Sequence, residues 1–129
     1  MMGPLMKTPL GKVRGRGAAR SGTEHFWLSR LTAIAEIPLE IAAVVIAVML
    51  IGTTYDQAVA IVGSPVTAVI LLLWILNAAI HMRLGMQVII EDYVHAELPK
   101  LLALMANTFF TVAMGLAGAY AILRISFGM

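Results

Sequence analysis

The chain has 129 residues, of which 60% are hydrophobic and 12% are charged, and its mean hydropathy is +0.92. This composition is far more apolar than that of a soluble domain of the same length, so a lipid bilayer is the expected solvent. Cysteine is absent, which excludes disulfides, thiolate-bound iron–sulfur clusters and zinc sites of the Cys type. Any redox metal must therefore be held by histidine or methionine.

Basic residues are concentrated at the amino terminus, although the net charge is only +2. Six of the nine Lys and Arg residues lie in the first thirty positions, namely Lys7, Lys12, Arg14, Arg16, Arg20 and Arg30. Residues 1–22 lack the apolar core of a signal peptide, so we interpret them as a basic, disordered cytoplasmic arm. An Arg-rich organellar transit peptide is the alternative. Lipid, and not nucleic acid, is the expected surrounding of the chain.

Three apolar segments, at residues 28–52, 65–94 and 98–127, are long enough to cross a bilayer, which takes about 20 residues. The sequence therefore predicts an all-α integral membrane protein whose residues 23–129 form three transmembrane helices. Lys and Arg accumulate on the side from which the chain is not translocated. We accordingly expect the amino terminus inside, the loop 53–64 outside, the segment 91–100 inside and the carboxyl terminus outside.

Two acidic residues lie inside the first predicted helix. Glu36 and Glu40 are four residues apart and share a helix face, with Pro38 between them. An ionised acid at the centre of a membrane costs about 2.5 to 3.5 kcal/mol even on the mild insertion scale. We interpret both as lying near the cytoplasmic interface or facing a partner subunit, paired or protonated. A role in a proton path is the alternative.

The second predicted helix begins with Ser64 as a possible cap and Pro65 at its first position. It contains His81, which follows seventeen residues without an ionisable group. An ionisable residue within a span is a candidate functional residue, and a neutral imidazole is a common axial ligand of haem iron. The alternative is a structural histidine that hydrogen-bonds to a neighbouring helix.

Residues on the face of His81 favour the haem interpretation. Gly85 lies one turn further on, where a missing side chain would let a flat porphyrin approach, and Asn77 and Val88 complete the stripe. Asp92 returns to within about 20° of His81, whereas the next residue, a tyrosine, is rotated by about 120° and lies about 18 Å further along the helix.

That tyrosine, Tyr93, has two interpretations. Its hydroxyl can donate a hydrogen bond to a carbonyl of an amphiphilic ligand dissolved in the membrane, or its ring is an ordinary interfacial anchor.

The other two histidines, His25 and His95, belong to the cytoplasmic interface. A second axial ligand at the depth of His81 must therefore come from another chain. The third helix begins near Pro99, contains the small-residue run 115–119 and is interpreted as scaffold.

Two sequence runs resemble a known family. The run from His81 to His95, HMRLGMQVIIEDYVH, closely resembles the H-x-x-x-G-x-x-x-x-x-x-D-Y-V signature of the hydrophobic D-type anchor subunit of succinate dehydrogenase, respiratory complex II. The run from Gly22 to Ile34, GTEHFWLSRLTAI, is similar to the entry of that family's first helix in its proteobacterial type. The resemblance covers residues 21–129.

The resemblance implies a role for five residues. His81 falls on the axial ligand of haem b, whose opposite ligand comes from the C-type cytochrome b anchor. Tyr93 and Asp92 fall on the ubiquinone site, Arg30 falls near the haem propionates, and His25 matches a second propionate residue less well. Glu36 and Glu40 depart from the apolar residues expected there.

The function implied is that of a membrane anchor without catalytic residues of its own. It would form a helical bundle with the C-type anchor and dock the iron–sulfur and flavoprotein subunits, so that electrons from succinate reach ubiquinone. Menaquinone is the alternative to ubiquinone as the electron acceptor. The bacterial inner membrane is favoured over the mitochondrial one. The alternative function is a small proton-coupled transporter that uses Glu36 and Glu40.

Overall fold

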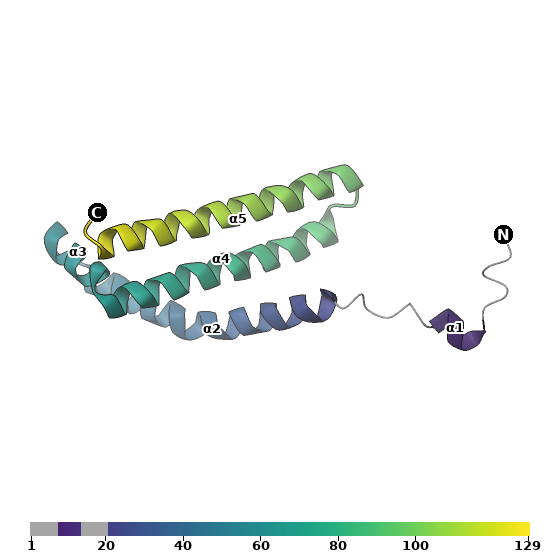
Figure 1. Cartoon of the computed structure of the whole chain (residues 1–129), viewed down its shortest axis with the longest axis horizontal. Coiled ribbons are helices and arrows are strands. Elements are labelled where there is room, and N and C mark those ends of the chain that lie inside the picture. The colour runs from purple at the N-terminus through teal and green to yellow at the C-terminus, as the bar shows by residue number, and fades with distance from the viewer. Residues whose placement is uncertain (1–7, 14–20) are drawn as a thin grey trace.

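The computed structural model describes residues 8–13 and 21–129, so the basic arm predicted for residues 1–22 lies mostly outside the described residues. The described residues form helices and no strand (Figure 1). The helices are α1 (Pro9–Val13), α2 (Ser21–Met49), α3 (Tyr55–Gly63), α4 (Pro65–Tyr93) and α5 (Glu97–Ser126).

Helices α2, α4 and α5 are each long and apolar enough to cross a membrane, which confirms the predicted all-α fold with three transmembrane helices. The 29 residues of α4 correspond to about 44 Å of helix, more than the hydrocarbon core of about 30 Å. One end of α4 must therefore protrude or the helix must tilt.

The three long helices form an open layer with α4 in the middle (Figure 1). Neighbouring helices run antiparallel, and α4 packs against α2 on one side and α5 on the other. Within the described residues, α2 and α5 do not contact each other. The beginning of α2, the end of α4 and the beginning of α5 lie at the same end of the layer, opposite to α3.

Small residues bring α5 close to α4. A Cβ added to Gly115 would lie 3.3 Å from the Cβ of Ala79, and one added to Gly118 would lie 2.7 Å from Cγ1 of Ile75. Both glycines therefore mark places where a larger side chain would push the two helices apart.

Helix α3 corrects the prediction of a loop at residues 53–64. The turn before it includes Gly52, which has a positive φ of 76°. The Thr54 hydroxyl then accepts from the Gln57 amide at 3.4 Å, and the Gln57 side chain accepts from the Thr54 amide at 3.0 Å. This capping box stabilises the first turn, and its T-x-x-Q pattern was a visible sequence signal.

The predicted cap of α4 is only partly correct. Ser64 occupies the N-cap position and Pro65 follows at the first helical position, but the Ser64 side chain makes no capping bond to the helix backbone. Its hydroxyl instead contacts the Ile61 carbonyl at 3.0 Å and the Thr67 hydroxyl at 2.8 Å. Ser64 therefore joins α3 to α4 through its side chain.

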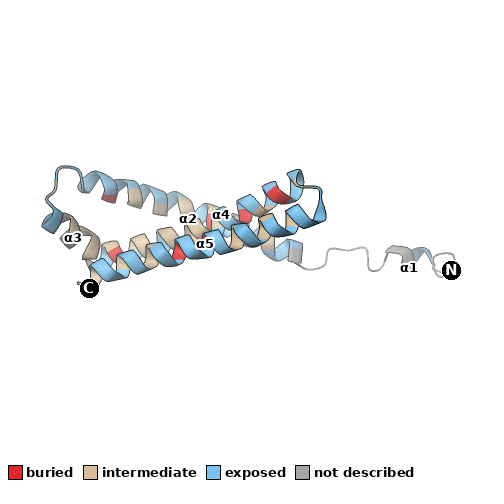
Figure 2. Cartoon of the chain, turned by 90° about the horizontal axis from the view of Figure 1, so that it is seen from above, coloured by how far each residue is buried: buried red, intermediate tan, exposed pale blue. Residues whose placement is uncertain are grey.

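Very few side chains are buried within the chain (Figure 2). Among the residues whose burial is described, the buried ones are Thr32, Ile46, Ala68, Leu84, Ile90, Thr111 and Gly115. Most large apolar side chains on the outer faces of the three long helices are exposed. These faces are suited to lipid or to another apolar protein.

Substitution of Gly118 by Leu should loosen the contact between α4 and α5, because the new side chain meets Ile75. We expect a loss of about 1 to 3 kcal/mol in the free energy of unfolding in mixed micelles, as for other overpacked interfaces. Ala117→Leu on the exposed face of α5 is the matched control and should change little. Equal effects of the two substitutions would contradict this packing.

Candidate functional site

His81 lies on α4 and is held against α2. Its Nδ1 atom is 3.0 Å from the hydroxyl oxygen of Thr32, and the imidazole is half-buried. By helical rise, His81 is about 18 Å from Tyr93, at the end of the same helix. The histidine therefore lies within the membrane-spanning part of the chain and contacts a neighbouring helix.

A row of hydrogen bonds joins α2 to α4 around this contact. Asn77 donates through Nδ2 to the Thr32 carbonyl at 2.9 Å and to the Glu36 carboxylate. The residues of this row are Thr32, Glu36, Glu40, Trp74, Asn77 and His81. Because α2 and α4 are antiparallel, residues further along α2 meet residues earlier on α4.

The two acidic residues in the middle of α2, Glu36 and Glu40, face α4. Glu36 accepts from Asn77, and Glu40 accepts from the indole nitrogen of Trp74 at 2.8 Å. The two carboxylates share a helix face, as the sequence predicted, and each has a hydrogen-bond donor within the chain. Glu36 is half-buried in this contact, whereas Glu40 remains exposed on the surface of the layer.

The helix surface beyond His81 is open. Gly85 is exposed, and a Cβ added to it would meet no atom of the described chain within 4 Å. Val88, on the same stripe, is 43% exposed. A flat group or a neighbouring chain could therefore approach the backbone of α4 beside His81.

Arg30 is not brought to His81. Its guanidinium carbon lies 5.3 Å from the centre of the Phe26 ring, and its side chain is exposed. Arg30 is two residues before Thr32 and so is rotated by about 200° from the face of α2 that contacts His81. If Arg30 binds a cofactor, the part of the cofactor that it binds lies outside the contact between α2 and α4.

His25 lies on the opposite side of α2 from Arg30. It is seven residues before Thr32, which brings it to within about 20° of the same face. Its Nε2 atom is buried and has no hydrogen-bond partner among the described residues. Buried polar atoms usually have a hydrogen-bond partner, so His25 is an exception among the described residues.

Asp92 and Tyr93 end α4, at the end of the layer where α2 begins (Figure 1). Both residues are exposed, and the Tyr93 side chain is 78% exposed. No hydrogen bond of the Tyr93 hydroxyl is found within the described chain. The hydroxyl is therefore available to a ligand or a neighbouring protein.

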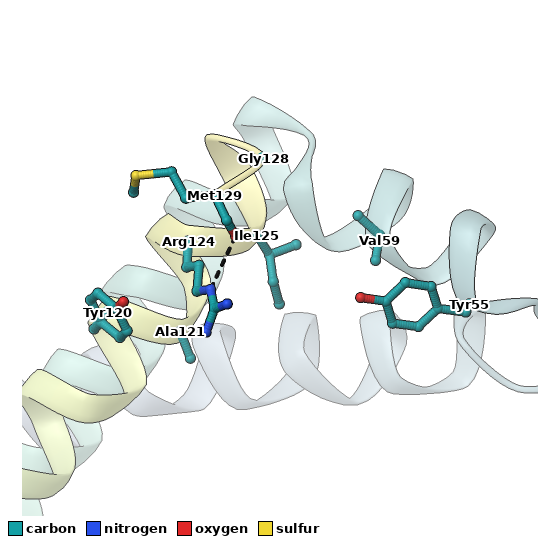
Figure 3. A pocket seen from close by; sticks show the side chains of 8 residues that line it. All are labelled: Tyr55, Val59, Tyr120, Ala121, Arg124, Ile125, Gly128 and Met129. Carbon is teal, nitrogen blue, oxygen red and sulfur yellow. Dashed lines mark hydrogen bonds between the residues drawn. The ribbon is translucent and has the colours of Figure 1, made fainter.

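A cavity at the opposite end of the layer contains none of the predicted site residues. It has a volume of about 580 Å³ between α3 and α5, and its lining includes Tyr55, Tyr120 and Arg124 (Figure 3). Arg124 donates through Nε to the Met129 backbone oxygen at 3.0 Å. The sequence predicts only a scaffold role for the third helix and gives no signal for this cavity.

Sequence reasoning also missed Thr32, the residue in contact with His81. Threonine is common in transmembrane helices, so its type carried no signal, and only the register of α2 against α4 selects it. No group of three or more His, Cys, Asp or Glu residues that could hold a metal ion occurs in residues 8–13 and 21–129. A protein-only metal cluster is thus not formed there, whereas a single axial ligand needs only one histidine.

Comparisons with known proteins agree with one another. Residues 4–117 match the family described as succinate dehydrogenase/fumarate reductase transmembrane subunit. A succinate dehydrogenase hydrophobic membrane anchor subunit of Paracoccus denitrificans is 29% identical over 121 residues, which cover 94% of this chain and 93% of that protein. The corresponding subunit of Rickettsia bellii is 26% identical over 101 residues, 78% of this chain and 81% of the relative.

A succinate dehydrogenase membrane anchor subunit of Reclinomonas americana is 33% identical over 95 residues, covering 66% of this chain and 73% of that protein. No solved structure matches the chain significantly.

The contact between Glu36 and Asn77 should be measurable as a coupling energy. In a double-mutant cycle with Glu36→Ala and Asn77→Ala, we expect a coupling of about 0.6 to 1.7 kcal/mol, as for other hydrogen bonds between transmembrane helices. The free energy of unfolding in mixed micelles provides the measurement. The control cycle uses Gln87 and Glu91, which bond within α4 and should couple by about 0.2 to 0.5 kcal/mol. A Glu36–Asn77 coupling no larger than the control would disprove the contact.

Proposed function

This chain belongs to the succinate dehydrogenase/fumarate reductase transmembrane subunit family, and we propose that it is a D-type anchor sharing a haem b site and a ubiquinone-reduction site with a C-type cytochrome b anchor. It is a multi-pass membrane protein of the succinate dehydrogenase anchor type, so its partners include catalytic subunits. The proposal adds that it docks the iron–sulfur and flavoprotein subunits. Electrons from succinate would then reach ubiquinone at the membrane.

The observation that carries the haem proposal is the surrounding of His81. One ring nitrogen contacts Thr32, which leaves Nε2 available as a ligand, and the surface beside Gly85 is open. These residues fit a haem with His81 as one axial ligand. When bound, haem supplies an iron that takes up and releases one electron.

The remaining predicted residues would lie around the haem and not on its iron. The other two histidines, His25 and His95, lie at or beyond the ends of helices, so the second axial ligand would come from the C-type anchor. We assign Arg30 to a haem propionate, since a guanidinium binds a carboxylate through two parallel hydrogen bonds. The family resemblance makes His25 a second, weaker candidate for a propionate.

The ubiquinone site is proposed at the end of α4. Tyr93 is 78% exposed, and its hydroxyl can donate a hydrogen bond to a quinone carbonyl. Asp92 is adjacent and exposed, and lies on the face of α4 that carries His81. This end would face the cytoplasm of a bacterial cell, because the amino-terminal basic residues favour the inside.

The open layer of helices favours the presence of a second anchor subunit. The outer faces of α2, α4 and α5 remain exposed, and a chain with one haem ligand has an incomplete haem site. A proton-coupled transporter is less well supported, because Glu36 and Glu40 bond to Asn77 and Trp74 inside the chain. Purification of the complex from membranes tests the whole proposal, since it should contain the C-type anchor, both catalytic subunits and haem b.

Tyr93→Phe should lower quinone reduction by the assembled complex about tenfold, because loss of one hydrogen bond of about 1.4 kcal/mol has this effect on rate. Succinate oxidation by a soluble electron acceptor should be unchanged, since it does not require the membrane site. Tyr55→Phe is the matched control, because Tyr55 is 82% exposed at the other end of the layer. A Tyr93→Phe complex with full quinone reductase activity would refute the assignment.

His81→Tyr should change the absorption spectrum of reduced haem in the purified complex or abolish haem binding. The physical reason is the loss of the imidazole ligand, which a phenol does not replace with the same electronic character. His95→Tyr is the control, because His95 follows the end of α4 and is exposed. An unchanged spectrum for His81→Tyr would remove His81 as the ligand.

A further inference from the structure

Thr32 is the residue of α2 that contacts the proposed haem ligand. It is one of two buried polar residues in the described chain, with 5% of its surface exposed. Its hydroxyl oxygen is 2.8 Å from the Leu28 carbonyl oxygen, 3.1 Å from that of Ser29 and 3.0 Å from His81 Nδ1. Three neighbours therefore compete for one hydroxyl group.

The position of the protons follows from what each neighbour can do. A carbonyl oxygen only accepts, and a hydroxyl has one proton to donate. A threonine in a helix commonly donates to a carbonyl three or four residues earlier, here that of Leu28 or Ser29. The lone pairs of the Thr32 oxygen are then left for His81, so Nδ1 must carry the proton and donate.

We propose that Thr32 is a positioning residue that holds His81 in the tautomer with the proton on Nδ1. This tautomer leaves the lone pair on Nε2, the nitrogen that is free to bind iron. A hydrogen bond from the remote nitrogen also fixes the ring orientation and raises the basicity of a metal-ligating imidazole. The inference rests on the proposed haem site and names a residue that the family resemblance did not.

The backbone around Thr32 is itself held in place. Asn77, one turn before His81 on α4, donates to the Thr32 carbonyl oxygen at 2.9 Å. The same amide contacts Glu36, one turn beyond Thr32 on α2. The hydroxyl of Thr32 is thus presented to His81 from a segment that α4 binds at a second point.

The chain contains a matched control for this threonine. Thr111 on α5 is 2% exposed, and its hydroxyl is 2.9 Å from the Asn107 carbonyl oxygen and 3.1 Å from that of Thr108. Its burial and its backbone bonds match those of Thr32. The two hydroxyl groups differ in their third contact, because among the described residues only the Thr32 hydroxyl contacts a histidine.

The experiment compares Thr32→Val, Thr32→Ser and Thr111→Val in the assembled complex. The first readout is the rate at which haem transfers to apomyoglobin, and the others are the haem midpoint potential and the electron paramagnetic resonance spectrum of the ferric haem. Loss of the partner of a ligating histidine typically weakens metal binding about 10- to 100-fold, so we expect faster haem transfer in Thr32→Val by about that factor. The haem midpoint potential of the Thr32→Val complex should rise, because a less basic imidazole stabilises ferric iron less.

Thr32→Ser should behave like the unsubstituted complex, since it retains the hydroxyl, and Thr111→Val should do so because it lacks a histidine partner. The inference is overturned if Thr32→Val matches Thr111→Val in all readouts, or if Thr32→Ser is as impaired as Thr32→Val. If Thr32→Val does not assemble, Thr32→Ala is compared with Thr111→Ala by the same criteria. Failure of the haem proposal is recognised separately, because His81→Tyr would then leave the haem spectrum unchanged.

Discussion

Polar side chains inside a bilayer have no water to bond with, and in this chain those of α2 and α4 bond with each other. The pairs are Thr32 with His81, Glu36 with Asn77, and Glu40 with Trp74. All three require one register of the antiparallel helices, and a shift by one turn, about 5.4 Å, would separate every donor from its acceptor. The placement of His81 within the layer therefore depends on the same hydrogen bonds that satisfy the two carboxylates.

Helix α4 has a different kind of contact on its other side. Against α5 it packs through Gly115 and Gly118, where the absence of side chains permits close approach. The polar contact with α2 sets register, and the contact through small residues with α5 sets distance. Since α2 and α5 do not contact each other, the part of the chain that the structure describes has two broad exposed faces and no closed core. An anchor of this form is suited to function as part of a larger bundle.

Hydropathy was sufficient to predict the three transmembrane helices, because spanning helices need long apolar segments and the chain has three. The shared face of Glu36 and Glu40 was also predictable from their spacing. Their partners were not, because the pairing depends on how α2 is aligned with α4, and each helix is apolar enough to allow several alignments. For the same reason Thr32 was missed, although His81 was identified. Helix α3 was missed because its apolar run is short, even though the capping box of Thr54 and Gln57 was visible.

The pairing of polar residues across α2 and α4 bears on how such a sequence changes over evolutionary time. Replacing Asn77 alone leaves the carboxylate of Glu36 without its donor, and replacing Glu36 alone leaves an amide without one of its acceptors. Either single change is destabilising in lipid, whereas loss of both polar groups together leaves no donor or acceptor of this pair without a partner. Selection therefore acts on Glu36 and Asn77 as a pair and not on either residue alone. Lineages with apolar residues at one position are expected to have compensated at the other, so covariation between α2 and α4 would record the register of the two helices.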